Sequence, residues 1–481
     1  MVRLPRRGRR PGPRTSDVTL VDESKVRRAV AAAAVGNTME WYDFGVFSYI
    51  TVVISQVFFP AGNPTAQLLS TFATFAVAFF VRPLGGFVFG PLGDRIGRQK
   101  VLAITMLTMA AGTTAIGLIP SYASVGIWAP ILLLCARLVQ GFSTGGEYGG
   151  ATTFVSEYAP DRRRGFMASW LEVGTLTGYT LGAAVVVALT VTLSGTAMLD
   201  WGWRIPFLAG GPLGLIGLYM RYRLEESPTY EQQEDGETGV AAGYRQIFGS
   251  HWRPLLICVG FVLTFNVTNY MLTAYMPTFL TSEVGFTHTH ALLLVLATML
   301  AVIGLVVVLG RYSDKIGRLP VVRVGSVALI VLAVPAFLLA SSGVWWTVLL
   351  GLVLLGVVLV SFSSTMPSSL PALFPTSVRY GGVSIGFNIS VALFGGTTPL
   401  VSEALIGATG SAVSPALLLV LAGVVGLVAG SFARESARRA LPDAAPTAAS
   451  EEEARQTARE QREDAANEDA ANEDAEDSSN R

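Results

Sequence analysis

The 481-residue sequence predicts an all-α integral membrane protein with twelve transmembrane helices in two pseudo-symmetric six-helix bundles. Three observations support this fold class. Hydrophobic residues make up 51% of the chain and charged residues only 14%, whereas an average soluble protein has about a quarter charged residues. Twelve apolar runs can each cross a bilayer, which requires about 20 mostly apolar residues. A charged loop motif also occurs twice, about 220 residues apart.

The repeated loop motif divides the chain into halves. Its first copy is 90–100 (GPLGDRIGRQK) and its second is 310–319 (GRYSDKIGRL). Each copy lies between two apolar runs, so each predicts a tight turn that joins two membrane helices. Glycine permits the sharp bend, and the Asp and Arg side chains can tie neighbouring helix ends together. Two copies at half-length spacing indicate an internal duplication.

The apolar runs follow one another in order, each ended by a charged, Gly-rich or Pro-rich turn. In the first half they cover about 28–58, 66–90, 101–120, 127–157, 166–194 and 203–222. In the second half they cover about 254–281, 290–311, 320–340, 344–372, 380–405 and 413–433. The predicted domains are a disordered basic cytoplasmic tail (1–25), an N-terminal bundle (26–222), a cytoplasmic linker (223–252), a C-terminal bundle (253–433) and a disordered acidic cytoplasmic tail (434–481).

Basic residues gather on one side of the predicted bundle. They occur in the N-terminal tail, in both loop motifs and in the turns after the fourth and tenth runs, whereas 61–67, 121–129, 341–344 and 407–414 contain no Lys or Arg. The positive-inside rule therefore predicts that both termini are cytoplasmic in a cell-membrane protein.

The turns after the fourth and tenth runs also repeat one another. Pro160 and Pro375 each precede an arginine by four residues, Arg164 and Arg379. These turns can brace the loop motifs and break as the halves rock, or they can simply end helices with positive-inside anchors. The candidate gating residues of these loops are Asp94, Arg95, Arg98, Arg164, Asp314, Arg318 and Arg379.

Ionisable residues inside apolar runs are costly in lipid and therefore usually carry function. Glu40 and Asp43 lie on one stripe of the first run, near mid-membrane. In the fourth run Arg137 and Glu147 are about 15 Å apart along the axis, too far to pair with each other. We expect Asp43 to pair with Arg137, and Glu40 and Glu147 to form an acidic region that binds coupling protons. The alternative is that these charges only lock helices together.

Aromatic and polar residues accompany these charges. Aromatic faces attract quaternary ammonium groups, so a box of rings with one or two carboxylates can hold a zwitterion such as a betaine or proline. The alternative is that the rings pack against lipid or other helices. The substrate-binding candidates are Asn37, Trp41, Phe44, Tyr148, Trp170, Glu172, Asn266, Tyr270 and Asn388.

The loop motif resembles the signature loop of the major facilitator superfamily. Residues 36–45, 82–86, 140–148, 158–162 and 200–207 are similar to its metabolite:proton symporter branch. Residues 266–272, 275–277 and 387–390 are similar to the proline/glycine betaine osmoprotectant transporters in that branch. The resemblance implies the major facilitator fold, a substrate site between the halves, and import of a zwitterionic compatible solute with protons by alternating access. It also implies an activity that rises with external osmolality.

The nearest competing function is proton symport of an organic acid of the ketoglutarate, citrate or shikimate type. Arg82, Arg137 and Arg204 can serve a carboxylate in either case. A dianion should require two cationic partners in the cavity, and the sequence places only Arg137 there, which favours a zwitterion. Export in place of import also stays open.

Other classes of protein fit the sequence poorly. A membrane enzyme would need a nucleophile with its base or a metal cluster at membrane depth, and the three histidines and two cysteines supply neither. We therefore expect no catalytic residues, no metal and no cofactor beyond the coupling proton. The expected partners are a small zwitterionic solute, protons and anionic lipid, without nucleic acid.

The acidic tail is a departure from the osmoprotectant subgroup, some of whose members carry a C-terminal coiled coil. From Ser450 onward the tail contains no Leu, Ile or Val, so it offers no coiled-coil seam. An anionic inner leaflet repels such a tail at low ionic strength, and salt screens the repulsion. We expect the tail to sense ionic strength.

Overall fold

The computed structural model describes residues 14–60, 62–96, 98–222 and 240–463. Near the gaps it gives the backbone but not the side chains of residues 25, 90–96, 98–100, 102, 217–222 and 240–244. The regular secondary structure of these residues is helical, apart from one pair of two-residue strands.

The first half contains these elements: α1 (Glu23–Tyr49), α2 (Thr51–Phe58), α3 (Pro64–Ile96), α4 (Arg98–Leu118), α5 (Tyr122–Val125), α6 (Trp128–Ser143), α7 (Glu147–Tyr158), α8 (Arg164–Thr192), α9 (Gly195–Ala197), the π-helix η3 (Met198–Gly202) and α10 (Arg204–Tyr222). The second half contains these: α12 (Val240–Ser250), α13 (Trp252–Tyr270), the π-helix η4 (Met271–Tyr275), α14 (Met276–Ser282), α15 (His288–Ile316), α16 (Arg318–Ala340), α17 (Trp345–Ser363), α18 (Met366–Ser369), α19 (Arg379–Ser390), the π-helix η7 (Val391–Gly395), α20 (Thr398–Thr409) and α21 (Ala416–Phe432).

In the part of the chain that the structure describes, twelve helical segments run from one end of the bundle to the other. Within the described residues, seven helical stretches are long and apolar enough to span a membrane, and α4, α10 and α21 contain shorter apolar helices. The remaining two segments are the first, α1 with α2, and the fourth, α6 with α7. The fourth run, expected as one helix, is broken at Thr144, Gly145 and Gly146, and Glu147 begins the next helix.

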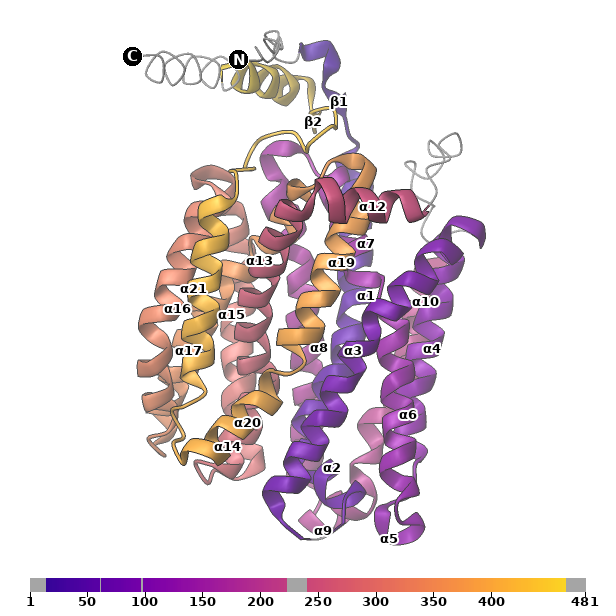
Figure 1. Ribbon diagram of the computed structural model, residues 1–481, viewed down its shortest axis with the longest axis vertical. Coiled ribbons are helices and arrows are strands. Elements are labelled where there is room, and N and C mark those ends of the chain that lie inside the picture. The colour runs from indigo at the N-terminus through magenta and orange to yellow at the C-terminus, as the bar shows by residue number, and fades with distance from the viewer. Residues whose placement is uncertain (1–13, 61, 97, 223–239, 464–481) are drawn as a thin grey trace.

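The two halves lie side by side, the first in indigo to magenta and the second in red to yellow (Figure 1). Across the interface α8 packs on α15, α7 on α19, and α3 on α19 and α20. We call the end with α12, residues 14–20 and residues 434–463 the tail end. The opposite end carries α9, α14 and α20 (Figure 1).

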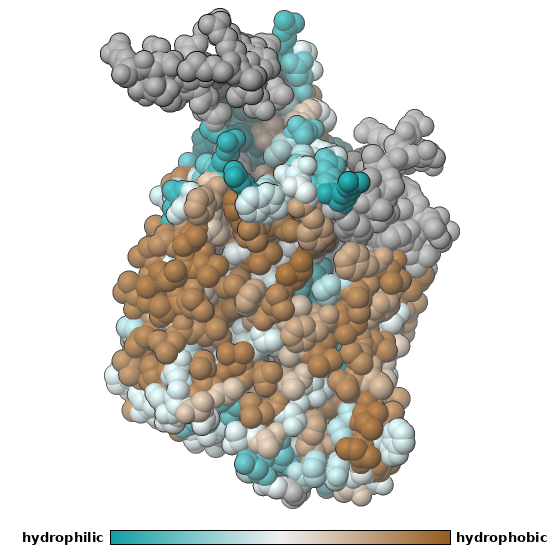
Figure 2. All heavy atoms as spheres, viewed as in Figure 1, coloured by the Kyte–Doolittle hydropathy of each residue, from teal (hydrophilic) through white to brown (hydrophobic). Residues whose placement is uncertain are grey.

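The outer surface is strongly apolar. On the face that Figure 2 shows, a broad band of hydrophobic residues covers the middle of the bundle, and hydrophilic residues lie toward its two ends. Large apolar side chains of α15, α16 and α21, such as Leu300, Val324 and Leu417, are more than half exposed. Acyl chains can cover such a surface and water cannot, which agrees with a multi-pass membrane protein.

Both tails differ from the disorder expected in their described parts. Strand β1 (Thr19–Leu20) pairs in parallel with β2 (Thr447–Ala448), and residues 451–463 are helical. Val18 packs with three alanines of the C-terminal segment, Ala448, Ala454 and Ala458. Disorder was predicted because this tail contains no Leu, Ile or Val. The contact with Val18 uses alanines, which contribute little to an apolar pattern.

Residues 434–463, which we call the strap, cross from the second half to the first at the tail end. Arg379 donates to the Pro442 carbonyl at 2.6 Å, and Arg164 donates to the Arg439 carbonyl at 2.9 Å. Gln461 donates to Asp161 at 3.0 Å. These are polar contacts to arginines and an aspartate near helix ends, so hydropathy could not predict them.

Candidate functional site

A buried ion pair lies at the centre of the bundle. Glu40 on α1 accepts from Arg82 Nη2 on α3 at 2.9 Å, and both side chains are at most 2% exposed. Arg82 Nε reaches Asn388 Oδ1 on α19 at 3.4 Å. Asn388 in turn donates to the Gly145 carbonyl, between α6 and α7. The network therefore joins the two halves at the level of Glu40.

Asp43 and Arg137 do not form the direct ion pair that we expected. The side chains of Gln140 and Thr113 connect them instead. Arg137 Nη1 donates to Gln140 Oε1 at 3.0 Å, Gln140 Nε2 donates to the Thr113 hydroxyl at 2.6 Å, and that hydroxyl donates to Asp43 Oδ2 at 2.6 Å. Counting depth along two helices could not reveal this relay, because Thr113 comes from a third helix, α4.

The acidic region expected around Glu40 and Glu147 is also different. Glu40 has an arginine partner, and Glu147 is buried at the first residue of α7. A further carboxylate, Glu172 on α8, accepts from the Tyr148 hydroxyl. The Tyr148 ring stacks on Phe387 of the second half with centroids 4.0 Å apart. Glu40 and Glu172 thus have different hydrogen-bond partners, Arg82 and Tyr148.

Aromatic rings form one wall of the centre. The Trp41 ring is 5.8 Å from Phe44, 5.5 Å from Tyr179 and 5.9 Å from Tyr270 of the second half. Phe79 lies 4.9 Å from Phe44 and 5.4 Å from Tyr270. The Arg137 and Arg82 guanidinium carbons lie 5.3 Å and 5.8 Å from the Phe44 ring. The rings therefore form one cluster, to which both halves contribute.

Two predicted substrate residues have other positions. Asn37 donates to the Leu171 carbonyl and the Thr175 hydroxyl, and its Oδ1 accepts from Trp41 Nε1 at 3.0 Å. It therefore orients Trp41 against α8. Trp170 is 40% exposed and does not join the cluster, which corrects that prediction. It lies on α8 about 200° around the helix from buried Glu172, and therefore on the outer face.

Several buried polar atoms in the centre have no hydrogen-bond partner among the described residues. They are Arg82 Nη1, Arg137 Nε and Nη2, Asn266 Oδ1 and Nδ2, Asn269 Nδ2 and the Tyr270 hydroxyl. Unsatisfied buried donors and acceptors are rare, because each costs about 1–3 kcal/mol. Their concentration here marks a place where a polar ligand or water completes the hydrogen bonding.

Close helix packing positions the two arginines. A Cβ added to Gly141 would lie 1.8 Å from the Ala78 carbonyl oxygen. A Cβ added to Gly85 would lie 1.8 Å from the Phe142 carbonyl oxygen. Only glycine permits α3 and α6 to approach so closely. Arg82 on α3 and Arg137 on α6 are thereby brought to the same aromatic wall.

Asp314, one of the loop residues predicted as gates, connects the halves at the tail end. Asp314 accepts from the backbone N–H of Gly165 at 2.8 Å and of Phe166 at 2.9 Å, so it caps the start of α8 across the interface. Arg318 lies 3.5 Å from Asp314. The side chains of Asp94, Arg95 and Arg98 lie outside the described residues.

The two Pro-x-x-x-Arg turns also make contacts at this end. Arg379 of the second half forms an ion pair with Glu157 of the first at 2.7 Å. Arg164 pairs with Asp161 within its own turn. The structure therefore has an inter-half ion pair at one of the two turns.

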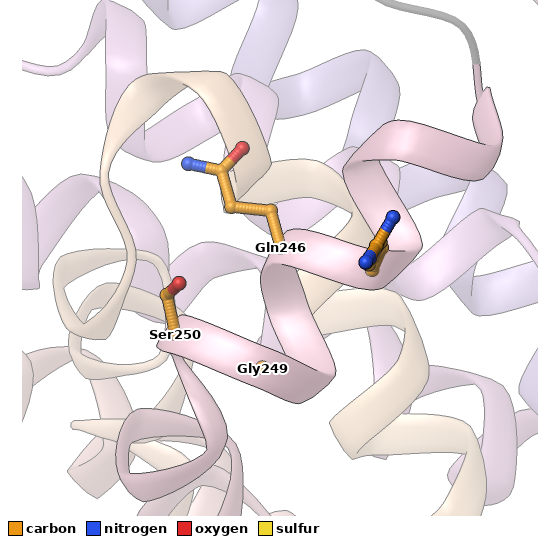
Figure 3. A pocket seen from close by; sticks show the side chains of 4 residues that line it. Gln246, Gly249 and Ser250 are labelled. Atoms are coloured by element: carbon orange, nitrogen blue, oxygen red, sulfur yellow. The ribbon is translucent and has the colours of Figure 1, made fainter.

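No partner was predicted for Arg82, and Glu403 was not predicted as a site residue. Both are ionisable residues inside apolar runs, and the rule that selected Glu40 would have selected them as well. A separate pocket on α12 is lined by Arg245, Gln246, Gly249 and Ser250 (Figure 3), and α12 lies at the tail end (Figure 1).

Comparison with known proteins gives close relatives. Residues 34–396 match the Major Facilitator Superfamily. The glycine betaine/proline/ectoine/pipecolic acid transporter of Dickeya dadantii is 47% identical over 453 residues, which cover 92% of this chain and 90% of that protein. The proline/betaine transporter of Escherichia coli K12 is 46% identical over 449 residues, with the same coverage. The ectoine/proline transporter of Corynebacterium glutamicum is 43% identical over 463 residues, covering 93% of this chain and 92% of that protein.

Solved structures resemble the fold. A proton:xylose symporter bound to 6-bromo-6-deoxy-D-glucose is 17% identical, with a TM-score of 0.70 over 87% of this chain and 98% of that one. The xylose transporter of E. coli in a partially occluded inward-open conformation is 18% identical, with a TM-score of 0.66 over 86% and 98%. At this identity the likeness concerns the two-bundle architecture alone.

Proposed function

Because the chain belongs to the Major Facilitator Superfamily, we propose that it is a secondary transporter that imports a zwitterionic compatible solute, such as proline or glycine betaine, together with protons. The names of relatives at 43–47% identity support this class of solute. Family membership also makes the chain a multi-pass cell-membrane transporter and not an enzyme.

One observation supports the substrate class most strongly. Unpartnered polar atoms and aromatic rings from both halves meet at the same buried place. The free Nε and Nη2 of Arg137 and the amide of Asn266 suit a carboxylate. The faces of Trp41, Phe44 and Tyr270 suit an ammonium group. A zwitterion carries both groups on one small molecule.

The centre holds two arginines where the sequence placed one, which would favour the competing organic acid if both were free. Arg82, however, is neutralised by Glu40. Asp43 and Glu172 have no arginine partner at ion-pair distance in the described structure. A dianion would therefore enter a site in which carboxylates outnumber free cations, so a zwitterion is favoured.

Proton coupling is assigned to the central acids, with Asp43 first. Its hydrogen-bond donor is the Thr113 hydroxyl, and Arg137 is reached only through the relay. A carboxyl that is buried without its own cation is suited to carry a proton. Glu40 and Glu147 are further candidates for binding the coupling proton. Arg137 acts on Asp43 through the hydrogen bonds of Gln140 and Thr113.

Alternating access follows from contacts that must break. Asp314 with α8, Arg379 with Glu157, and the strap close the tail end. We infer that this end is cytoplasmic, because the basic loops lie there. The strap and the relatives' solutes are consistent with activity that rises with osmolality.

Uptake into proteoliposomes with an imposed proton gradient tests the function. Labelled glycine betaine, proline and ketoglutarate are compared, with dissipation of the gradient as control. We expect accumulation of glycine betaine or proline that collapses without the gradient. Accumulation of ketoglutarate alone would establish the organic-acid alternative.

A further inference from the structure

A buried carboxylate of the second half stands apart from the central cluster. Glu403 on α20 is 4% exposed. Among the described residues its hydrogen-bond donor is the Tyr275 hydroxyl, 3.1 Å from Oε2, and no Lys or Arg lies within ion-pair distance. A carboxylate buried in a membrane-spanning segment without a cation is costly. It therefore calls for a positive partner that these residues do not supply.

Aromatic rings from both halves accompany this carboxylate. The Tyr275 ring is 6.1 Å from Phe72 on α3 of the first half and 6.0 Å from Phe279 on α14. The face of an aromatic ring carries partial negative charge, so rings beside a carboxylate attract organic cations and disfavour anions. The combination suits an alkylated ammonium better than a metal ion, since it provides few oxygen ligands.

This group lies between the central cluster and the opposite end. Phe72 precedes Phe79 of the central wall by seven residues, about 10 Å along α3 toward its start. Both α14 and α20 lie at the opposite end (Figure 1). Glu283, at the end of α14, is exposed and adds negative charge near Glu403. A cation that enters from this end meets Glu403 before it reaches Trp41.

We propose that Glu403, Tyr275 and Phe72 form an outer subsite that binds the ammonium group of the solute on its way to the centre. The inference rests on the proposed function for its solute. When the halves part, Phe72 moves away from Tyr275, the Tyr275 hydroxyl leaves Glu403, and the ammonium takes the vacated oxygen. The subsite repels dianions, so it selects by charge before the central cluster is reached.

Binding of labelled tetramethylammonium to the purified full chain in nanodiscs tests the subsite, because this probe is a cation without a carboxylate. We expect Glu403→Gln to weaken binding at the outer subsite at least about tenfold, since it removes the charge. Tyr275→Phe keeps the ring and frees the carboxylate, so it should tighten binding. Misfolding cannot produce these opposite shifts together. Glu283→Gln is the matched control and should stay within about twofold of wild type.

Two outcomes would overturn the subsite. One is binding by Glu403→Gln and Tyr275→Phe that equals wild type. The other is a Glu403→Gln protein that keeps tetramethylammonium binding but loses proton-driven uptake, which would assign Glu403 to proton transfer. Glycine betaine uptake by wild type separates the two proposals. If wild type does not take up glycine betaine but the variants show the expected changes in tetramethylammonium binding, the proposed transport function is wrong and the subsite is supported.

Discussion

The Asp43 carboxylate accepts a hydrogen bond from the Thr113 hydroxyl, whereas the Glu40 carboxylate forms an ion pair with Arg82. We therefore expect different roles for the two acids. We predict that Asp43→Asn abolishes proton-driven accumulation of glycine betaine but keeps solute exchange between the two sides. The amide retains the shape and the Thr113 contact but cannot bind and release the proton. Uptake and counterflow in proteoliposomes measure the two activities separately.

The control for this variant is Asp200→Asn, because Asp200 is exposed near the opposite end. It should keep both activities. Proton-driven accumulation by Asp43→Asn at the wild-type level would remove Asp43 from the coupling mechanism.

The Glu40–Arg82 pair should behave as one unit in stability. Arg82→Gln leaves a buried carboxylate uncompensated, which costs about 3–5 kcal/mol, and the double variant with Glu40→Gln should recover much of that loss. Thermal unfolding of the two single variants and the double variant completes a double-mutant cycle. Strictly additive losses would mean that the two side chains do not interact.

At the level of residues, the sequence predicted which side chains face the interior better than which ones pair. Glu40, Asp43 and Arg137 were identified because an ionisable side chain in an apolar membrane span has a high free-energy cost. The helical periodicity of α1 placed Glu40 and Asp43 on one stripe. Pairing depends on how each helix is rotated and on neighbours from other helices, such as Thr113 and Arg82. Trp170 was misplaced because aromatic residues suit lipid-facing and interior positions alike.

Among the elements, the contact of α3 with α6 is the one that places both central arginines. Gly141→Ala introduces a methyl group where the Ala78 carbonyl oxygen already lies, at 1.8 Å, so the helices must separate. We expect a loss of about 1–3 kcal/mol in stability and reduced uptake, because Arg82 and Arg137 move apart. Thermal unfolding and transport assays check both effects.

Gly304→Ala is the matched control for this substitution. Gly304 lies in α15 and has open space where a Cβ would stand. Alanine is the better helix former there, so stability should be equal or slightly higher. If Gly141→Ala were as stable and active as Gly304→Ala, close approach of α3 and α6 would not govern the site.

On the scale of the whole molecule, the strap connects the halves at the tail end and makes their closure sensitive to pH. The Glu435 carboxylate accepts backbone hydrogen bonds from Arg318, Leu319, Ser436 and Ala437. Burial alone raises the pKa of Glu435, but these four bonds lower it by more, so its pKa lies below the ordinary value. The attachment is therefore present above the unfolded-state pKa and is lost as pH falls through the folded-state pKa.

Hydrogen-exchange protection factors for 434–448 measure this attachment. We expect strong protection at pH 7 that is lost at acid pH, when the Glu435 carboxylate becomes protonated. Glu435→Gln should lower protection at neutral pH, whereas exposed Glu451→Gln should not. Protection that is independent of pH in the wild type would contradict a role for the Glu435 carboxylate.

The overall fold was the most predictable level, because apolar length and an internal repeat are properties of the sequence alone. The break at 144–146 was not predicted, since residues 127–157 read as one apolar run. The strap was missed because it is held by carbonyls and carboxylates on arginines. Such contacts depend on where distant helix ends meet, which no local pattern encodes.

The central claim is that a zwitterion and protons cross together between two rocking halves. The most direct test is the change in lumenal pH, read by a trapped dye, when glycine betaine is added to proteoliposomes without an imposed gradient. We predict acidification that follows glycine betaine or proline, is absent with ketoglutarate and is lost in Asp43→Asn. Solute entry without acidification, or acidification with ketoglutarate alone, would contradict it.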